Sequence, residues 1–215
     1  MLKGIFLKTK ITYSTNELEN AIDYLEKAAF FFNESNDKHR FKWLMISLHG
    51  ALYSFGICNI KGTNPIGRIF KTIKKKKLDM IIEKVKRNYT DFIYGDQSEE
   101  SFLRYGTFMG GQILDIHTVL SRCESEAYMM QFTHSKTLKI GTEQRLAIEK
   151  LISYRNDFAH FKPMAYGITE NYENDIVLPV LKVIEFLALE TNNILYPQVE
   201  SCERVKHAIK QISLN

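Results

Sequence analysis

The chain of 215 residues has few cysteines, and no two of them form a C-x-x-C pair. Three widely spaced thiols, Cys58, Cys123 and Cys202, cannot all be bridged, so a reducing cytoplasm is the expected compartment. The longest apolar run, from Trp43 to Cys58, is interrupted by polar residues and is shorter than the ~20 residues that a membrane span requires. No membrane partner is therefore expected, and we interpret this run as a buried core helix.

The sequence also lacks the patterns of several large enzyme classes. No glycine-rich stretch is followed by G-K-[S/T], no dense Asp/Glu or Cys/His cluster is visible, and no serine or cysteine shows an accompanying base. A bound nucleotide cofactor, a metal site and triad chemistry are therefore not expected. His49, inside the apolar run, is expected to be a hydrogen-bonded core histidine.

Strand signals are missing as well, because no segment alternates apolar and polar residues for long and no hairpin turn joins two such runs. Helical periodicity predicts an all-α fold, with residues 1–215 forming one domain and one bundle. A capping box at residues 14–17 is expected to start the first helix. Further helices are predicted at 38–60, 66–89, from about 101 to 124, from 142, around 180–195 and around 199–212; residues 125–141 are ambiguous.

Polar residues gather in the segment LISYRNDFAHFKP at residues 151–163, at the end of an apolar helix. Asn156 and His160 lie four residues apart on one helical face, and Arg155 lies on a flanking face at an angle that still permits the tips of Arg155 and His160 to converge on one phosphate. A guanidinium can bind phosphoryl oxygens bidentately, and an imidazole can transfer a proton near neutral pH. Arginine and histidine in a last helical turn also cap carbonyls and interact favourably with the helix dipole, so a purely structural role is the alternative.

The pattern Arg155-Asn-Asp-Phe-Ala-His160 resembles the R-x-x-x-x-H signature of HEPN domains, all-α proteins of prokaryotic toxin and defence systems, many of which are metal-independent ribonucleases. The residues that follow it, and the core run from Phe41 to Leu52, are similar to one branch of that family. The resemblance implies a HEPN-type bundle and a homodimer with a composite site at the two-fold axis. RNA would be cleaved there by attack of a 2′-hydroxyl.

Within that resemblance, His160 would act as general base or acid, Arg155 would stabilise the developing charge, and Asn156 would orient the phosphate or the imidazole. A subset of the family carries H-x-Y, whose tyrosine an antitoxin modifies. Lys162 occupies the tyrosine position here, although Tyr166 is close by, so an antitoxin partner stays open. Lys162 would instead add positive charge beside the site, which favours binding to RNA.

Positive charge exceeds negative charge by only four, but it is clustered between Arg68 and Arg87. Lys74, Lys75, Lys76 and Lys77 are consecutive, and the apolar residues that follow them predict an amphipathic helix with a basic side. This side could follow an RNA backbone or simply face solvent. The sequence thus predicts an endoribonuclease of a toxin or phage-defence system. The alternatives are an inactive helical module that binds RNA, a nucleotide or a partner protein, and a plain structural bundle.

Overall fold

A computed structural model describes residues 13–89, 98–160, 167–168 and 171–213 of the chain. In these ranges the protein is all-α, as predicted, and contains no β-strand. The elements in chain order are α1 (Glu17–Asn33), α2 (Arg40–Ile60), α3 (Lys75–Tyr89), α4 (Glu99–Gly110), α5 (Ile116–Cys123), α6 (Glu126–Met129), α7 (Thr142–Ala159), the π-helical segment η2 (Glu173–Val177), α8 (Leu178–Glu185), the π-helical segment η3 (Phe186–Glu190) and α9 (Val199–Ser213).

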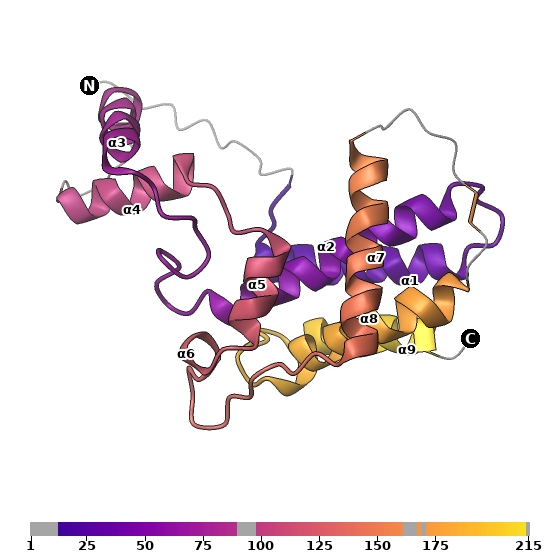
Figure 1. The fold of residues 1–215 in the computed structure, drawn as a ribbon. Helices are drawn as coiled ribbons and strands as arrows, with labels where there is room; N and C mark the ends of the chain where they lie inside the picture. The colour runs from indigo at the N-terminus through magenta and orange to yellow at the C-terminus, as the bar shows by residue number, and fades with distance from the viewer. Residues whose placement is uncertain (1–12, 90–97, 161–166, 169–170, 214–215) are drawn as a thin grey trace, which may run out of the picture.

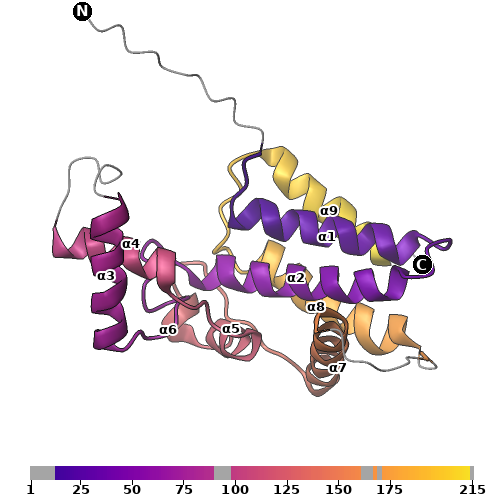
Figure 2. The ribbon, with the colours of Figure 1, turned by 90° about the horizontal axis from the view of Figure 1, so that it is seen from above.

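Helix α2 is the centre of the bundle. It packs against α1, α5, α7 and α8, and α9 covers the other side of α1. Figure 2 shows α9, α1 and α2 side by side, and Figure 1 shows α7 crossing α2 at a steep angle. The C-terminal part of α7, where the R-x-x-x-x-H motif lies, contacts the start of α2 through Tyr154 and Phe158.

The first two helices form where the sequence predicts them, because both have the predicted apolar face. Residues of α1 at helical spacing are fully or almost fully buried: Ala21, Ile22, Leu25, Ala28, Ala29 and Phe32. The start of α1 differs from the prediction. Asn16, and not Ser14, is the N-cap, and its side-chain oxygen accepts backbone N–H bonds from Leu18 and Glu19 at 3.0 and 2.9 Å.

Helix α2 is buried over most of its length, as the apolar run from Trp43 to Cys58 predicts. By length and composition alone it could cross a membrane, but 72% of its most apolar window is buried inside the protein. Trp43 is the exception near its start, because 42% of its side chain is exposed. The burial agrees with the interpretation of this run as a core helix.

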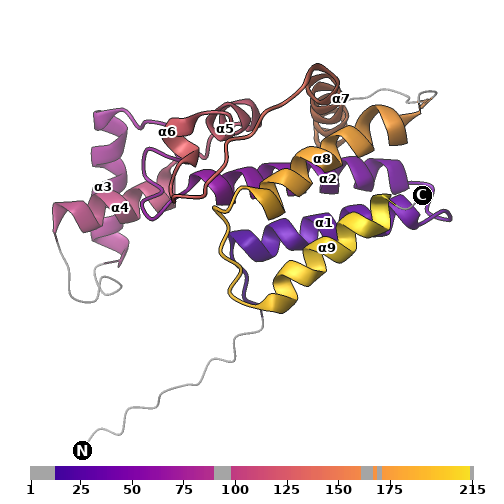
Figure 3. The ribbon, with the colours of Figure 1, turned by 90° about the horizontal axis from the view of Figure 1, so that it is seen from below.

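Helices α3 and α4 pack against each other and project from one end of the bundle, away from α7 (Figure 1, Figure 3). The prediction of one helix over 66–89 was wrong at its start, because α3 begins at Lys75. The chain before it forms an isolated antiparallel bridge between Phe70 and Ile113. The predicted helix from 101 to 124 is two helices, broken after Gly110. A Cβ at Gly110 would lie 2.7 Å from the end of Ile81, so glycine here allows α3 and α4 to approach closely.

Candidate active site

Arg155 lies on the inner side of α7. It continues the buried stripe of Ile148, Leu151 and Ile152, whose exposed fractions are 9% or less. Its own side chain is only half-buried, because this stripe leaves the core as α7 crosses α2. The helix that carries the motif therefore directs its arginine toward the α2 side and leaves part of the guanidinium accessible.

Asn156 binds this arginine directly. The Arg155 Nη1 donates a hydrogen bond of 2.9 Å to the Asn156 side-chain oxygen. Side chains of adjacent helical residues do not normally face each other, so the long arginine side chain must bend back toward its neighbour. The bond uses one of the five N–H donors of the guanidinium and restricts its orientation.

Two residues of α2, His49 and Tyr53, lie within electrostatic reach of this guanidinium. His49 and Tyr53 are one helical turn apart, and their rings stack with centroids 6.4 Å apart. The Tyr53 hydroxyl donates a 2.6 Å hydrogen bond to the carbonyl of Leu114, just before α5. This bond fixes the tyrosine ring and, through the stacking, restricts the place of the imidazole.

The positive charge of Arg155 affects the pKa values of both His49 and Tyr53. Burial, and then the positive charge of Arg155, lower the pKa of His49 from 6.5 to about 4. Burial, and then the negative charge of Asp115, raise the pKa of Tyr53 to about 12, while Arg155 acts in the opposite direction. At neutral pH the site therefore presents a cationic guanidinium next to a neutral imidazole and a neutral phenol.

His160 occupies a different position from Arg155. It is the C-cap of α7, its backbone N–H donates to the Asn156 carbonyl at 3.0 Å, and its side chain is exposed. Five helical residues correspond to about 7.5 Å along the axis and about 140° around it. Within one chain, Arg155 thus turns toward α2, whereas His160 lies at the open end of the helix.

Aromatic rings hold the end of α7 on α2. Phe41 of α2 makes edge-to-face contacts with Tyr154 at 5.1 Å and with Phe158 at 5.9 Å between ring centroids. A third edge-to-face contact joins Phe41 to Tyr172 at 5.0 Å. Pairs of this kind add about 0.5–1.5 kcal/mol beyond the burial of their area. They hold the last turns of α7, and with them the backbone of Arg155, against the first turn of α2.

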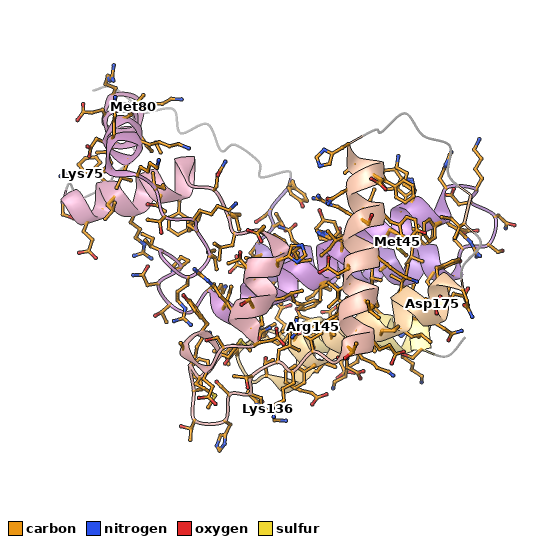
Figure 4. All side chains as sticks on the ribbon, viewed as in Figure 1. Met45, Lys75, Met80, Lys136, Arg145 and Asp175 are labelled. Atoms are coloured by element: carbon orange, nitrogen blue, oxygen red, sulfur yellow. The ribbon has the colours of Figure 1, made fainter. Side chains whose placement is uncertain are left out.

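The other predicted site residues are either outside the described part of the chain or on α3. Lys162 and Tyr166 lie outside the described residues. Lys74, Lys75, Lys76 and Lys77 are exposed at the start of α3. Figure 4 shows Lys75 and Met80 on the projecting α3–α4 pair, at the opposite end of the molecule from Asp175. Among the described residues, no group of three or more His, Cys, Asp or Glu side chains is arranged to hold a metal ion.

The sequence analysis interpreted His49 as a core histidine and did not include it among the candidate site residues. Its burial was predicted correctly, since only 8% of it is exposed, whereas the predicted side-chain hydrogen bond is not found among the described residues. Nothing in the sequence indicates that it lies near Arg155, which is more than a hundred residues away, because only the crossing of α7 over α2 brings them together. The chain was also compared with known proteins. No protein-family model, curated protein or solved structure matches it.

Proposed function

We propose that the chain is a HEPN-type, metal-independent endoribonuclease. The observation that carries this proposal is the half-buried guanidinium of Arg155, hydrogen-bonded to Asn156 and five residues before the exposed His160. A fixed cation beside groups that are neutral at neutral pH is suited to a phosphodiester, which carries a single negative charge. The resemblance of residues 155–160 to the HEPN signature supports the same class, and with it a toxin or phage-defence role in the cytoplasm.

The proposed reaction is an in-line displacement at phosphorus. The 2′-oxygen of RNA forms a bond to the adjacent phosphorus, and the bond from phosphorus to the 5′-oxygen breaks. A base removes the 2′-hydroxyl proton and an acid protonates the leaving 5′-oxygen, which gives a 2′,3′-cyclic phosphate and a 5′-hydroxyl. His160 supplies one of these proton transfers, and Arg155 stabilises the charge that develops on the phosphoryl oxygens.

We propose that two chains complete the site. Arg155 is half-buried on the face of α7 that continues its core stripe, whereas His160 is exposed at the C-cap about 140° around the helix, which favours a site shared between two chains. A two-fold dimer in which the ends of two α7 helices meet would place His160 of each subunit near Arg155 of the other. Dimerisation is then a requirement for cleavage as well as a feature of the assembly.

The lysines of α3 are the proposed RNA-capturing surface. Lys75, Lys76 and Lys77 form the first turn of α3, which contains no acidic residue. Positive side chains at a helix N-terminus are unfavourable, because the helix dipole places positive partial charge there. A bound phosphate backbone would offset this repulsion and would also interact with the free N–H groups of the helix end. This arrangement is easier to explain by RNA binding than by solvation alone.

The second candidate is an inactive helical module that binds RNA, a nucleotide or a partner protein. The separation of Arg155 and His160 within one chain favours it, since a binding module does not need the two groups to converge. Cleavage distinguishes the two functions.

The test is the cleavage of single-stranded RNA by the purified protein in EDTA. Arg155→Ala is expected to reduce cleavage by about 10²–10³-fold, as for loss of one group that stabilises a transition-state charge. His160→Ala is expected to reduce it by about 10²–10⁴-fold, as for loss of a general acid or base. The products of the wild-type protein should carry cyclic phosphate and 5′-hydroxyl ends.

Matched controls are available on exposed positions. Arg145→Ala removes an arginine of the same helix that pairs with Glu124, and His134→Ala removes an exposed histidine. Both controls should cleave like the wild-type protein. An active preparation whose rate is unchanged in Arg155→Ala and His160→Ala would reject the proposed site. RNA binding without any cleavage would favour the inactive module.

A further inference from the structure

A pocket separate from the candidate active site lies between α8, η3 and the loop that precedes α7. Its volume is about 490 Å³, within the range of about 300–1,000 Å³ that is usual for small-molecule sites. Lys136, Lys139 and Lys182 line it, together with the carboxylate residue Glu190. The pocket reaches only the first turn of α7, whereas Arg155 lies near the end of that helix.

The three lysines come from two segments that the fold holds together. Lys136 and Lys139 belong to the loop before α7, and Lys182 belongs to α8. The backbone N–H of Lys136 donates to the Thr191 carbonyl at 3.0 Å, directly after η3. Between the two loop lysines, Leu138 is buried in the core with 3% exposed. The loop is therefore anchored beside the end of η3.

The positive charge of this pocket is not balanced within the chain. All three lysines are exposed, and no hydrogen bond or ion pair joins their side chains to another described residue. Glu190 also lines the pocket, but no ion pair connects it to any of the lysines. Like charges that share a pocket repel one another, and a multiply charged anion offsets this repulsion.

The uncharged part of the pocket suits an organic group. Phe186 is half-buried and contributes an aromatic ring, next to the buried Val183. Two half-buried polar side chains of the lining add donors. The Gln144 side-chain oxygen accepts from the Gly141 N–H at 2.9 Å, which leaves its amide N–H groups available. The Thr137 hydroxyl is bonded to no other described residue.

The helical wall of the pocket has an uncommon local geometry. Phe186 and Glu190, which both line the pocket, are the first and last residues of the π-helical segment η3. Turns of this kind are rare and occur frequently at functional sites. The buried Asn59 side chain of α2 donates to the Leu187 carbonyl in this turn at 2.8 Å. The core therefore holds the turn in place, and the wall of the pocket is a fixed feature of the fold.

We propose that this pocket binds a small molecule that carries a diphosphate group. A diphosphate has several negative charges close together, and its tetrahedral phosphates accept hydrogen bonds from separate directions. Ammonium groups from two segments match this geometry, because lysine binds phosphate as a point charge on a flexible stem. Any organic body of the ligand would pack against Phe186. The inference goes beyond the proposed function, since it requires neither RNA nor Arg155.

The first experiment is isothermal titration calorimetry of the full chain in metal-free buffer with pyrophosphate, ADP, adenosine and citrate. Pyrophosphate and ADP should bind, and adenosine should not, because it carries no charge. A higher affinity for ADP than for pyrophosphate would identify a diphosphate ester as the ligand, and equal affinities would identify free pyrophosphate. Citrate that binds as tightly as pyrophosphate, or a lack of binding by both phosphate compounds, would overturn the proposal.

The second experiment locates the anion with Lys136→Gln and Lys182→Gln, which each remove one charge from a different segment. Each variant should weaken pyrophosphate binding by about 10-fold, as for loss of one hydrogen bond to a charged group. Both positions are exposed, so thermal unfolding without ligand should match the wild-type protein. Lys75→Gln/Lys76→Gln removes two exposed lysines of α3 as the matched control and should bind normally. An equal loss in the control would overturn the pocket.

Arg155→Ala separates this inference from the proposed function. It should bind pyrophosphate with wild-type affinity, whether or not the protein cleaves RNA. Loss of binding in Arg155→Ala, together with normal binding in Lys136→Gln/Lys182→Gln, would place the anion at the candidate active site and reject the pocket. A protein that binds pyrophosphate through Lys136 and Lys182 but does not cleave RNA would reject the ribonuclease and support the pocket.

Discussion

Arg155 donates a 2.9 Å hydrogen bond to the side-chain oxygen of Asn156, its immediate neighbour on α7. The bond bends the arginine along the helix surface and ties its guanidinium to one orientation. It gives the asparagine of the motif a role that does not require contact with RNA. Arg155 therefore supplies the positive charge, and Asn156 orients the guanidinium that carries it.

Asn156→Ala tests this relationship. We expect a slower single-turnover cleavage with little change in RNA affinity, because the charge of Arg155 stays but its orientation is lost. The decrease should be smaller than that caused by Arg155→Ala. In the double variant the two effects should not add, because both act through one guanidinium. Strictly additive losses would show that Asn156 acts independently of Arg155.

Charge reversal at the start of α3 should separate RNA binding from helix stability. In Lys75→Glu/Lys76→Glu, two acidic residues replace two basic ones in the first turn, which should stabilise α3 by about 0.3–1 kcal/mol for each residue. RNA affinity should fall, and the slope of log K against log salt should become shallower by about 0.7 for each lost contact. Salt-dependent filter binding and thermal unfolding measure the two effects.

The control for this variant is Lys136→Glu/Lys139→Glu, which makes the same charge change at two exposed lysines of the loop before α7. Figure 4 shows Lys136 far from Lys75. An equal loss of affinity in both variants would mean that RNA binds to the overall positive charge and that the α3 surface has no special role.

The pH dependence of stability should report the buried imidazole of His49. Unfolded, this side chain takes up a proton near pH 6.5, whereas in the folded protein its pKa is lowered to about 4. Between these values the unfolded state binds more protons, so the free energy of unfolding decreases as the pH falls. The contribution approaches about 1.4 kcal/mol for each pH unit. Denaturant unfolding between pH 6.5 and pH 5 measures it.

His49→Leu should flatten that pH profile, because the group that titrates is gone. His134→Leu should leave the slope unchanged, since this histidine is exposed. Equal slopes for the wild-type protein and His49→Leu would show that the folded protein accepts a proton on His49 as readily as the unfolded chain does.

Gly50 is the test of close packing between the first two helices. A Cβ at Gly50 would lie 2.5–2.7 Å from three atoms of the Tyr24 ring, so the ring would have to move. Gly50→Ala should destabilise the protein by about 1–3 kcal/mol despite the better helix propensity of alanine. Gly167→Ala, where no atom lies within 4 Å of the added group, is the control. Urea unfolding of the two variants should differ by that amount.

Local sequence signals predicted the helices well where one apolar face is long and uninterrupted. The buried residues of α1, from Ala21 to Phe32, and the burial of α2 follow from spacing alone. The predictions were wrong where a short-range feature decides a boundary. Asn16 competes successfully with Ser14 for the N-cap, and the helix predicted to run from about 101 to 124 ends at Gly110, with Gly111 as its C-cap.

The amino-acid sequence by itself determined the helical class, the order of most helices, and the presence of an arginine, an asparagine and a histidine at the end of α7. Those features depend on residue periodicity and on neighbours a few positions away. Only the tertiary structure decided that Arg155 lies within electrostatic reach of His49 and Tyr53 and that His160 is exposed at the end of the helix. The physical reason is that the crossing of α7 over α2 is set by packing between residues far apart in the chain, such as Phe41 against Tyr154.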